Sequence, residues 1–244
     1  MKRTGLLIAL ALLLLLSACG KKMPELSLVT EAYPPLTFEQ DGKLSGYGVD
    51  VVEAIQKKLG TNFQTRLMSW DEAYRKALSE ANVVIFTLEK TPEREELFHF
   101  VGPLGANTAS VYVPKSSTLN FESLEDLRKL SSIATTGNWF TEIYLKEQGF
   151  ENLLSMADPK DNIRAVISGE ADASVFTDIT YPLLATDAGI AADELSPVYT
   201  LMTTEFYIGI SKATDAKVVE LWQKAFDDLA QDGRIDELKD KWLK

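Results

Sequence analysis

This sequence is poor in the residues from which many catalytic and metal sites are built. It has one cysteine and one histidine in 244 residues, which leaves no His/Cys metal cluster and no Ser–His or Cys–His pair. His99, between Phe98 and Phe100, is expected to be an ordinary strand residue. The glycines are scattered in turns and form no phosphate-binding loop. We therefore expect no metal, no cofactor and no enzymatic activity.

Positive charge is also scarce. The chain has 25 Lys and Arg against 36 Asp and Glu, a net charge of -11, which argues against nucleic acid as a partner. Hydrophobic residues make up 45% of the chain, as in an ordinary globular protein. The length allows one large domain or two smaller lobes.

The N-terminus reads as a targeting segment. Lys2 and Arg3 precede an apolar core over residues 5–16 that is too short to remain in a bilayer as a spanning helix. It ends in Leu16-Ser17-Ala18-Cys19, which resembles the lipobox of bacterial lipoproteins. The resemblance implies a signal peptide over 1–18, a lipidated (palmitate-bearing) Cys19 and a tether over 19–24. The alternative is a plain secretory signal in which Cys19 is incidental.

The body of the chain alternates between strand and helix patterns. The first five elements are expected at Glu25–Thr30, Val49–Leu59, Phe63–Met68, Trp70–Leu78 and Val83–Phe86. This β-α-β-α-β order predicts a mainly parallel sheet with helices on both faces.

A second α/β set follows a looser stretch at Phe98–Ala106. Its expected elements are Leu124–Leu130, Ser132–Thr135, Trp139–Gln148, Leu153–Leu154, Pro159–Ser168 and Asp172–Phe176. Extended segments at Thr108–Val113, Val198–Met202 and Glu205–Ile210 flank this set, and the C-terminus is helical. We expect two sheets, joined by two extended crossings near Asn107–Val113 and Leu201–Ile208.

One segment suggests a ligand site. The buried strand ends with Thr87 and Glu89 on alternate residues, and Thr91-Pro92-Glu93-Arg94 looks like a helix start with a capping threonine and proline at the first position. Open α/β sheets bind ligands at such strand ends, and free backbone N–H groups with a guanidinium make an anion site. The alternative is that Arg94 is a surface residue paired with a nearby glutamate.

Several stretches resemble the extracytoplasmic solute-binding proteins of family 3, which bring amino acids to ABC importers. The resemblance is carried by Thr30–Leu36, Asp41–Val51, Thr91–Arg94, Ala225–Trp242 and, less specifically, Gly169–Ala173. It implies an α/β, two-lobe periplasmic binding protein fold (type II). The implied lobe 1 covers 25–110 and returns at 203–244, and the implied lobe 2 covers 111–202.

The resemblance also implies roles for single residues. Arg94 matches the arginine that grips the ligand's α-carboxylate. Tyr33 and Trp70 match aromatic positions beside the ligand's side chain, and Thr87 matches a polar contact. In lobe 2, Gly137-Asn138-Trp139 matches a turn that contacts the ligand, and the acid for the α-amino group falls at Asp178, or at Thr177 under a tighter alignment.

Two departures from the family pattern bear on the ligand. Glu89 stands where the family usually has Ser or Thr, and a carboxylate there would favour a cationic group on the ligand or pair with Arg94. Trp139 replaces a small polar residue, which removes a hydroxyl and adds bulk.

The resulting hypothesis is a binding protein, expected to be a monomer, that captures an amino acid or related carboxylate and delivers it to the membrane subunits of an ABC importer. It would lie in the periplasm, anchored to the membrane through Cys19. Two alternatives stay open: a dehydratase-type enzyme on the same scaffold, with Glu89 as general acid, and a ligand-sensing subunit for a signalling partner.

Overall fold

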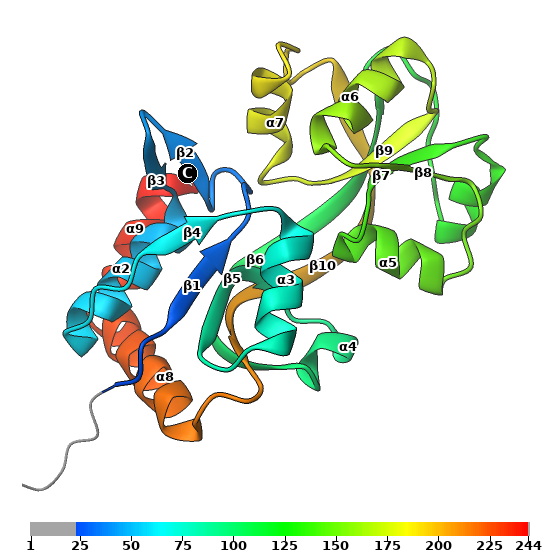
Figure 1. The fold of residues 1–244 in the computed structure, drawn as a ribbon. Coiled ribbons are helices and arrows are strands. Elements are labelled where there is room, and N and C mark those ends of the chain that lie inside the picture. The colour runs from blue at the N-terminus through cyan, green and yellow to red at the C-terminus, as the bar shows by residue number, and fades with distance from the viewer. Residues whose placement is uncertain (1–22, 244) are drawn as a thin grey trace, which may run out of the picture.

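The computed structural model describes residues 23–243 (Figure 1). The strands are β1 (Ser27–Thr30), β2 (Phe38–Gln40), β3 (Lys43–Ser45), β4 (Thr65–Leu67), β5 (Val83–Glu89), β6 (Phe98–Pro114), β7 (Ile133–Thr136), β8 (Leu153–Met156), β9 (Ala173–Thr177) and β10 (Leu195–Ser211). The helices are α2 (Tyr47–Leu59), α3 (Trp70–Ser79), α4 (Pro92–Glu95), the 3-10 helix η1 (Leu124–Lys129), α5 (Phe140–Glu147), α6 (Pro159–Ser168), α7 (Tyr181–Asp187), α8 (Ala216–Gln231) and α9 (Arg234–Trp242). The expected signal peptide, lipidated Cys19 and most of the tether lie outside the described residues.

The fold is the expected α/β arrangement of two lobes (Figure 1). In lobe 1, β1 pairs in parallel with β4 and β5. In lobe 2, β7 pairs in parallel with β8 and β9. Helices flank both parallel sets, as the alternating sequence pattern predicts.

The two expected sheets are continuous with each other through the crossings. One eight-stranded sheet runs in the order β4-β1-β5-β10-β6-β9-β7-β8. The crossings are the two 17-residue strands β6 and β10, which pair antiparallel with each other and border β9 and β5, respectively. The stretch Phe98–Ala106, expected to be loose, belongs to β6, because its partner β10 supplies backbone hydrogen bonds that local glycine content does not reveal.

Local sequence signals set the ends of the helices in lobe 1. Helix α2 ends at Gly60, whose left-handed backbone (φ 67°) lets its N–H reach the last carbonyls. Helix α3 begins with a capping box between Ser69 and Glu72. Gly46, before α2, has φ 125°, and a Cβ there would clash with the Leu36 carbonyl oxygen, so this entry turn requires glycine.

Each lobe has its own apolar interior. Lobe 1 buries one large cluster, to which α8 contributes Trp222. Lobe 2 buries two clusters, one around Val111 and one around Phe176. Trp139 belongs to lobe 2 in sequence but packs in the lobe 1 cluster, so the lobes are in direct contact.

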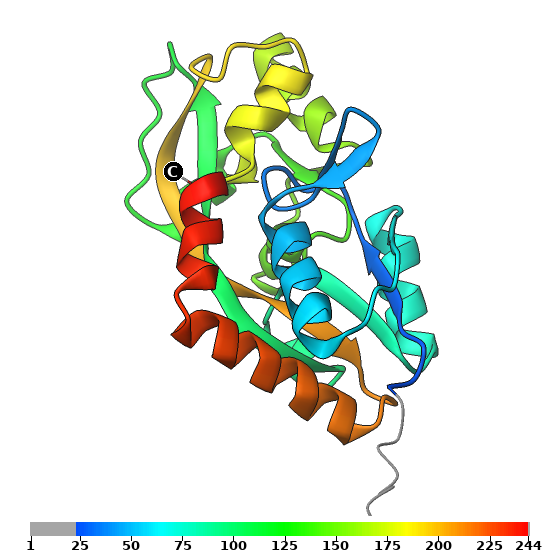
Figure 2. The same ribbon diagram turned by 90° about the vertical axis from the view of Figure 1, so that its left-hand side faces the viewer.

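The C-terminal helices return to lobe 1 (Figure 2). Helix α8 packs against α2 and β6, and α9 packs against α2. The Trp242 indole N–H donates to Asp50 Oδ2 at 2.8 Å, which ties α9 to α2. Helix α7 has no counterpart in the sequence-based expectations, because Pro182 and the small residues around it obscure a helical pattern.

Candidate functional site

The carboxyl end of β5 meets a short helix, as the sequence predicts. Thr91 is the N-cap of α4, and its hydroxyl accepts from the backbone N–H of Arg94 at 3.4 Å. Pro92 occupies the first turn. This turn directs the Arg94 side chain back to β5, where it is only 2% exposed. The alternative of an exposed surface arginine is therefore wrong.

Arg94 is enclosed by one acid and two rings. Its Nη1 lies 3.5 Å from Glu89 Oε2 and donates to the Glu89 carbonyl oxygen at 3.3 Å. Its guanidinium carbon lies 4.9 Å from the centre of the Trp70 ring and 5.4 Å from that of Tyr74. Because Glu89 is 5% exposed, both charges lie in a sheltered environment in which their interaction is weakly screened.

A network of polar side chains spans the two lobes. Asn107, on the crossing strand β6, donates through Nδ2 to Glu89 Oε1 at 2.9 Å and to the Tyr33 hydroxyl at 3.1 Å. Tyr33 in turn donates to Glu89 Oε1 at 3.4 Å. Across the cleft, the Tyr33 and Thr177 hydroxyls lie 2.8 Å apart. One hydrogen-bonded cluster therefore connects β5, β6 and both lobes.

A second contact between the lobes involves Trp139. Its ring meets that of Tyr33 edge-on, with ring centres 5.5 Å apart, and Trp139 also acts on the Glu31 carboxylate, whose charged form it favours. Burial and, after it, the nearby Glu89 carboxylate raise the pKa of Glu31, Arg94 and Trp139 oppose the rise, and the resulting pKa is about 8. Burial also raises the pKa of Glu89, although Arg94, Asn107 and Tyr33 favour its charged form.

The remaining expected site residues are placed differently. Asn138 is exposed, and its Nδ2 donates to Asp71 Oδ1 of lobe 1 at 3.3 Å. Asp178 is exposed and accepts from the Tyr112 hydroxyl at 3.0 Å. Thr177, the alternative to Asp178, contacts Tyr33 across the cleft.

Thr87 lies at an irregularity in the β5–β10 pairing. Its backbone is left-handed, with φ 63°, and the strand register shifts beside it. The side chain is buried, its hydroxyl donates to the Phe86 carbonyl, and its methyl group faces Gly48. This bulge turns Thr87 out of the alternation expected for a regular strand.

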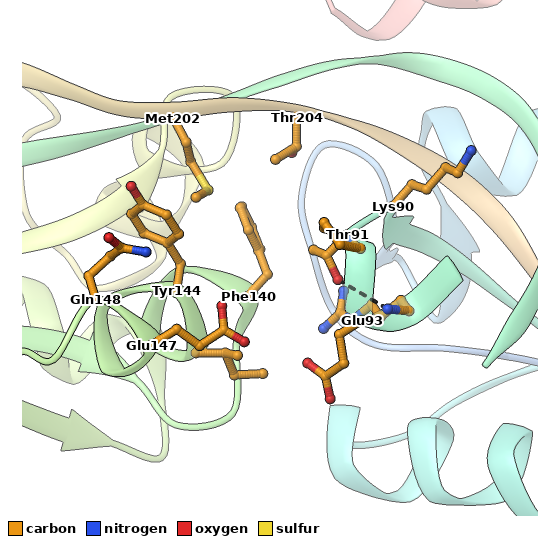
Figure 3. A pocket seen from close by; sticks show the side chains of 12 residues that line it. Lys90, Thr91, Glu93, Phe140, Tyr144, Glu147, Gln148, Met202 and Thr204 are labelled. Carbon is orange, nitrogen blue, oxygen red and sulfur yellow. Dashed lines mark hydrogen bonds between the residues drawn. The ribbon is translucent and has the colours of Figure 1, made fainter. Parts of the chain in front are cut away.

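A cavity of about 360 Å³ lies between the lobes beside Arg94 (Figure 3). Lobe 1 contributes Lys90, Thr91, Pro92, Glu93 and Arg94 to its walls, while Phe140, Ile143, Tyr144, Glu147 and Gln148 come from α5 and its end, and Met202 and Thr204 from β10. Arg94 therefore lies between the polar cluster and an open space that both lobes line. The volume is in the range of small-molecule sites.

Sequence reasoning left Glu31, Asn107 and Thr177 out of the chosen site. Glu31 lies two residues before Tyr33 in the first loop, and its proximity to a predicted site residue could have pointed to it. Thr177 had been weighed as the alternative to Asp178. Asn107 had no signal of its own, because only the pairing of β6 with β10 brings it beside Glu89.

Between residues 23 and 243, no group of three or more His, Cys, Asp or Glu side chains is arranged to hold a metal ion. Over the same range, no helix combines the length and the apolar character needed to cross a membrane.

Comparison with known proteins identifies similar chains. Residues 26–244 match the family described as bacterial extracellular solute-binding proteins, family 3. The chain is 23% identical over 255 residues to the probable amino-acid-binding protein YxeM of Bacillus subtilis, covering 100% of this chain and 96% of that protein.

Solved structures share the fold. A histidine kinase sensor domain similar to periplasmic binding proteins aligns with a TM-score of 0.80 at 23% identity, over 89% of this chain and 96% of that one. An ancestral arginine-binding protein bound to arginine aligns with a TM-score of 0.78 at 22% identity, over 91% of this chain and 100% of that one.

Proposed function

The chain belongs to the bacterial extracellular solute-binding proteins of family 3, and we propose that it captures an amino acid or a related small carboxylate between its two lobes. The matched family and the relative YxeM are binding proteins, which agrees with the expectation of a protein without catalytic activity. No observation on the described residues favours the dehydratase alternative.

The observation that carries this proposal is the position of Arg94. Its guanidinium is buried at a strand end, with aromatic rings on one side and a cavity lined by both lobes on the other. A guanidinium binds a carboxylate through paired hydrogen bonds, and each such bond is worth roughly 1.5–3 kcal/mol when sheltered from water. Trp70, Tyr33 and Trp139 would enclose the rest of the ligand.

The contacts between the lobes support capture by closure. Tyr33–Thr177, Glu31–Trp139 and Asp71–Asn138 each join side chains of opposite lobes. A ligand that contacts both lobes shifts the population toward the closed form by as much as its affinities for the two forms differ. The long strands β6 and β10 are the connections through which the lobes would move.

The test is calorimetric titration of the purified mature protein with the proteinogenic amino acids and with small di-acids and polyamines. The proposal predicts one-to-one binding of at least one carboxylate ligand, with a Kd of about 1 µM or tighter. Scattering measurements should show compaction on binding. If no member of the panel binds, the proposal is wrong.

We further propose that the mature protein is a lipid-anchored monomer that delivers its ligand to an ABC importer. The support is the Leu16-Ser17-Ala18-Cys19 motif after an apolar core. Cys19→Ser should move the protein from the membrane fraction to the soluble fraction in the native host, while Ser116→Ala, on an exposed position of lobe 2, should not. Equal membrane association of Cys19→Ser and wild type would exclude the anchor.

A further inference from the structure

The cavity beside Arg94 is separate from the site formed by Tyr33, Trp70 and Trp139. None of these three rings lines its walls. Arg94 is the residue that the cavity shares with the polar cluster, and its guanidinium is engaged by Glu89 at 3.5 Å and by the Trp70 ring. The cavity is therefore a space that the proposed capture of a carboxylate does not use.

Apolar and aromatic side chains form much of the cavity wall. Phe140 belongs to a buried cluster of lobe 2, and Tyr144 and Met202 pack against that cluster. Ile143 adjoins them on α5, and Pro92 contributes to the wall from lobe 1. Because covering apolar surface is favourable, these walls suit the apolar part of a small molecule.

Two carboxylates reach into the same space from opposite walls (Figure 3). Glu93 comes from α4 of lobe 1, and Glu147 comes from the end of α5 in lobe 2. Within the described part of the chain, neither carboxylate takes part in an ion pair or a hydrogen bond with a protein group. Two unpaired anions that face one space favour a positively charged occupant.

The neighbouring lysines are already paired with other acids. Lys90 lines the cavity, but its ammonium lies 3.3 Å from Glu95, and Figure 3 shows its side chain directed away from the space. Lys146 precedes Glu147 in the sequence, but its ammonium lies 2.8 Å from Glu142. Neither lysine therefore neutralises the two carboxylates that face the cavity.

We propose that this cavity is a second binding site, which takes an organic ammonium ion with an apolar or aromatic body. The ammonium group lies between Glu93 and Glu147, and the body packs on Phe140 and Tyr144. Aromatic rings cover apolar groups and also attract organic cations through their faces. A cavity of about 360 Å³ has room for roughly 12 non-hydrogen atoms if each takes about 30 Å³, the volume of a water molecule.

Binding in this cavity favours closure of the two lobes. Because Glu93 belongs to lobe 1 and Glu147 to lobe 2, a ligand that contacts both binds the closed form more tightly and shifts the population toward it. The same closure brings Tyr33 to Thr177. Resting on the proposed function, the ammonium ion and the captured carboxylate therefore strengthen each other's binding.

The test is calorimetric titration of the purified mature protein with 2-phenylethylammonium chloride at pH 7. We expect one-to-one binding with a Kd of about 1 mM or tighter. Ethylammonium, which lacks the ring, and 2-phenylethanol, which lacks the charge, should each bind at least about fivefold more weakly. Equal affinity for either compound, or no binding of 2-phenylethylammonium up to about 10 mM, would overturn the proposal.

Substitutions that remove the two charges locate the binding. Glu93→Gln and Glu147→Gln keep the size of each side chain, and together they should weaken the binding of 2-phenylethylammonium by about five- to tenfold. Glu220→Gln removes an exposed charge on α8, outside the cavity, and should leave the affinity unchanged. Equal affinities of the double variant and the wild type would overturn the proposal.

A second titration separates this inference from the proposed function. With 2-phenylethylammonium at saturation, an amino acid that binds in the calorimetric panel should bind about fivefold more tightly or better. A weaker affinity would mean that the cation competes at the Arg94 site, which would contradict a separate site, and an unchanged affinity would contradict the coupling. If no amino acid binds but the cation binds in a manner that depends on Glu93 and Glu147, the proposed function is wrong and the cavity site stands.

Discussion

The hydroxyl of Tyr33 lies 2.8 Å from the hydroxyl of Thr177, although the two residues are 144 positions apart in the sequence. Tyr33 comes from the first loop of lobe 1, and Thr177 ends β9 of lobe 2. The same phenol accepts from Asn107 on the crossing strand and donates to Glu89. This single oxygen therefore connects both lobes and the strand between them.

Removal of that oxygen should weaken the contact between the lobes. Tyr33→Phe keeps the ring that meets Trp139 but loses the hydrogen bonds to Thr177, Asn107 and Glu89. We expect the ligand-free protein to be more open in small-angle scattering and its ligand affinity to fall by about 5- to 30-fold, the equivalent of about 1–2 kcal/mol.

The matched control is Tyr199→Phe, which alters a tyrosine packed on the lobe 2 core and should change neither measurement. If Tyr33→Phe gives the scattering curve and the affinity of the wild type, the Tyr33–Thr177 contact does not hold the lobes together.

Arg94→Ala should abolish carboxylate binding. Loss of two charge-assisted hydrogen bonds, at roughly 1.5 kcal/mol each or more, corresponds to at least about a 100-fold loss of affinity. Because the variant leaves Glu89 buried without its cation, we also expect a lower melting temperature. Arg75→Ala, on the exposed face of α3, is the control, and near-normal affinity in Arg94→Ala would remove Arg94 from the site.

The stability of the ligand-free protein should fall as pH rises between about 5 and 8. The ordinary pKa of a glutamate is 4.5, and that of Glu31 in the folded protein is about 8. Between these two pH values the folded state therefore binds more protons than the unfolded state. Stability is then fully present below the unfolded pKa and is lost as pH rises through the folded pKa.

The measurement is the melting temperature across this window in wild type and in Glu31→Gln, where the amide removes the titrating group. The difference between the two proteins should grow in favour of Glu31→Gln as pH rises. A constant difference would mean that Glu31 titrates normally.

Gly48→Ala should disturb Thr87 from the opposite side. A Cβ at Gly48 would lie 2.9 Å from the Thr87 methyl group and 3.3 Å from the Leu36 carbonyl oxygen. Such overpacking costs about 1–3 kcal/mol, and it pushes on a residue in a left-handed bulge at the strand end. Chemical denaturation should show the lower free energy of unfolding. An unchanged value would mean that the bulge at Thr87 shifts to accommodate the added methyl group at little cost.

The sequence predicted the parts of the fold that depend on local pattern. The run Val83–Phe86 predicts a buried strand, and Thr91-Pro92 predicts the helix start at which Arg94 is buried. The pairing of β6 with β10 was not predictable in this way. It joins residues such as Asn107 and Thr204, which are far apart in the chain, and glycines in β6 suggested a loose segment instead.

The site shows the same division. Local motifs pointed to Arg94 and Glu89 and to a possible ion pair between them. The choice between Asp178 and Thr177 depended on which of two consecutive residues faces the cleft, and the end of β9 directs Thr177 toward Tyr33 and Asp178 toward Tyr112. The raised pKa of Glu31 arises from its burial and from the nearby Glu89 carboxylate, against the opposing effects of Arg94 and Trp139, and no single stretch of sequence brings these residues together.

The most direct test of the central claim is a crystal structure of the mature protein with an amino acid that binds in the calorimetric panel. The account predicts a ligand carboxylate oxygen within about 3 Å of the Arg94 guanidinium, with atoms of both lobes against the ligand. A ligand bound outside the cleft, or one whose carboxylate points away from Arg94, would contradict it.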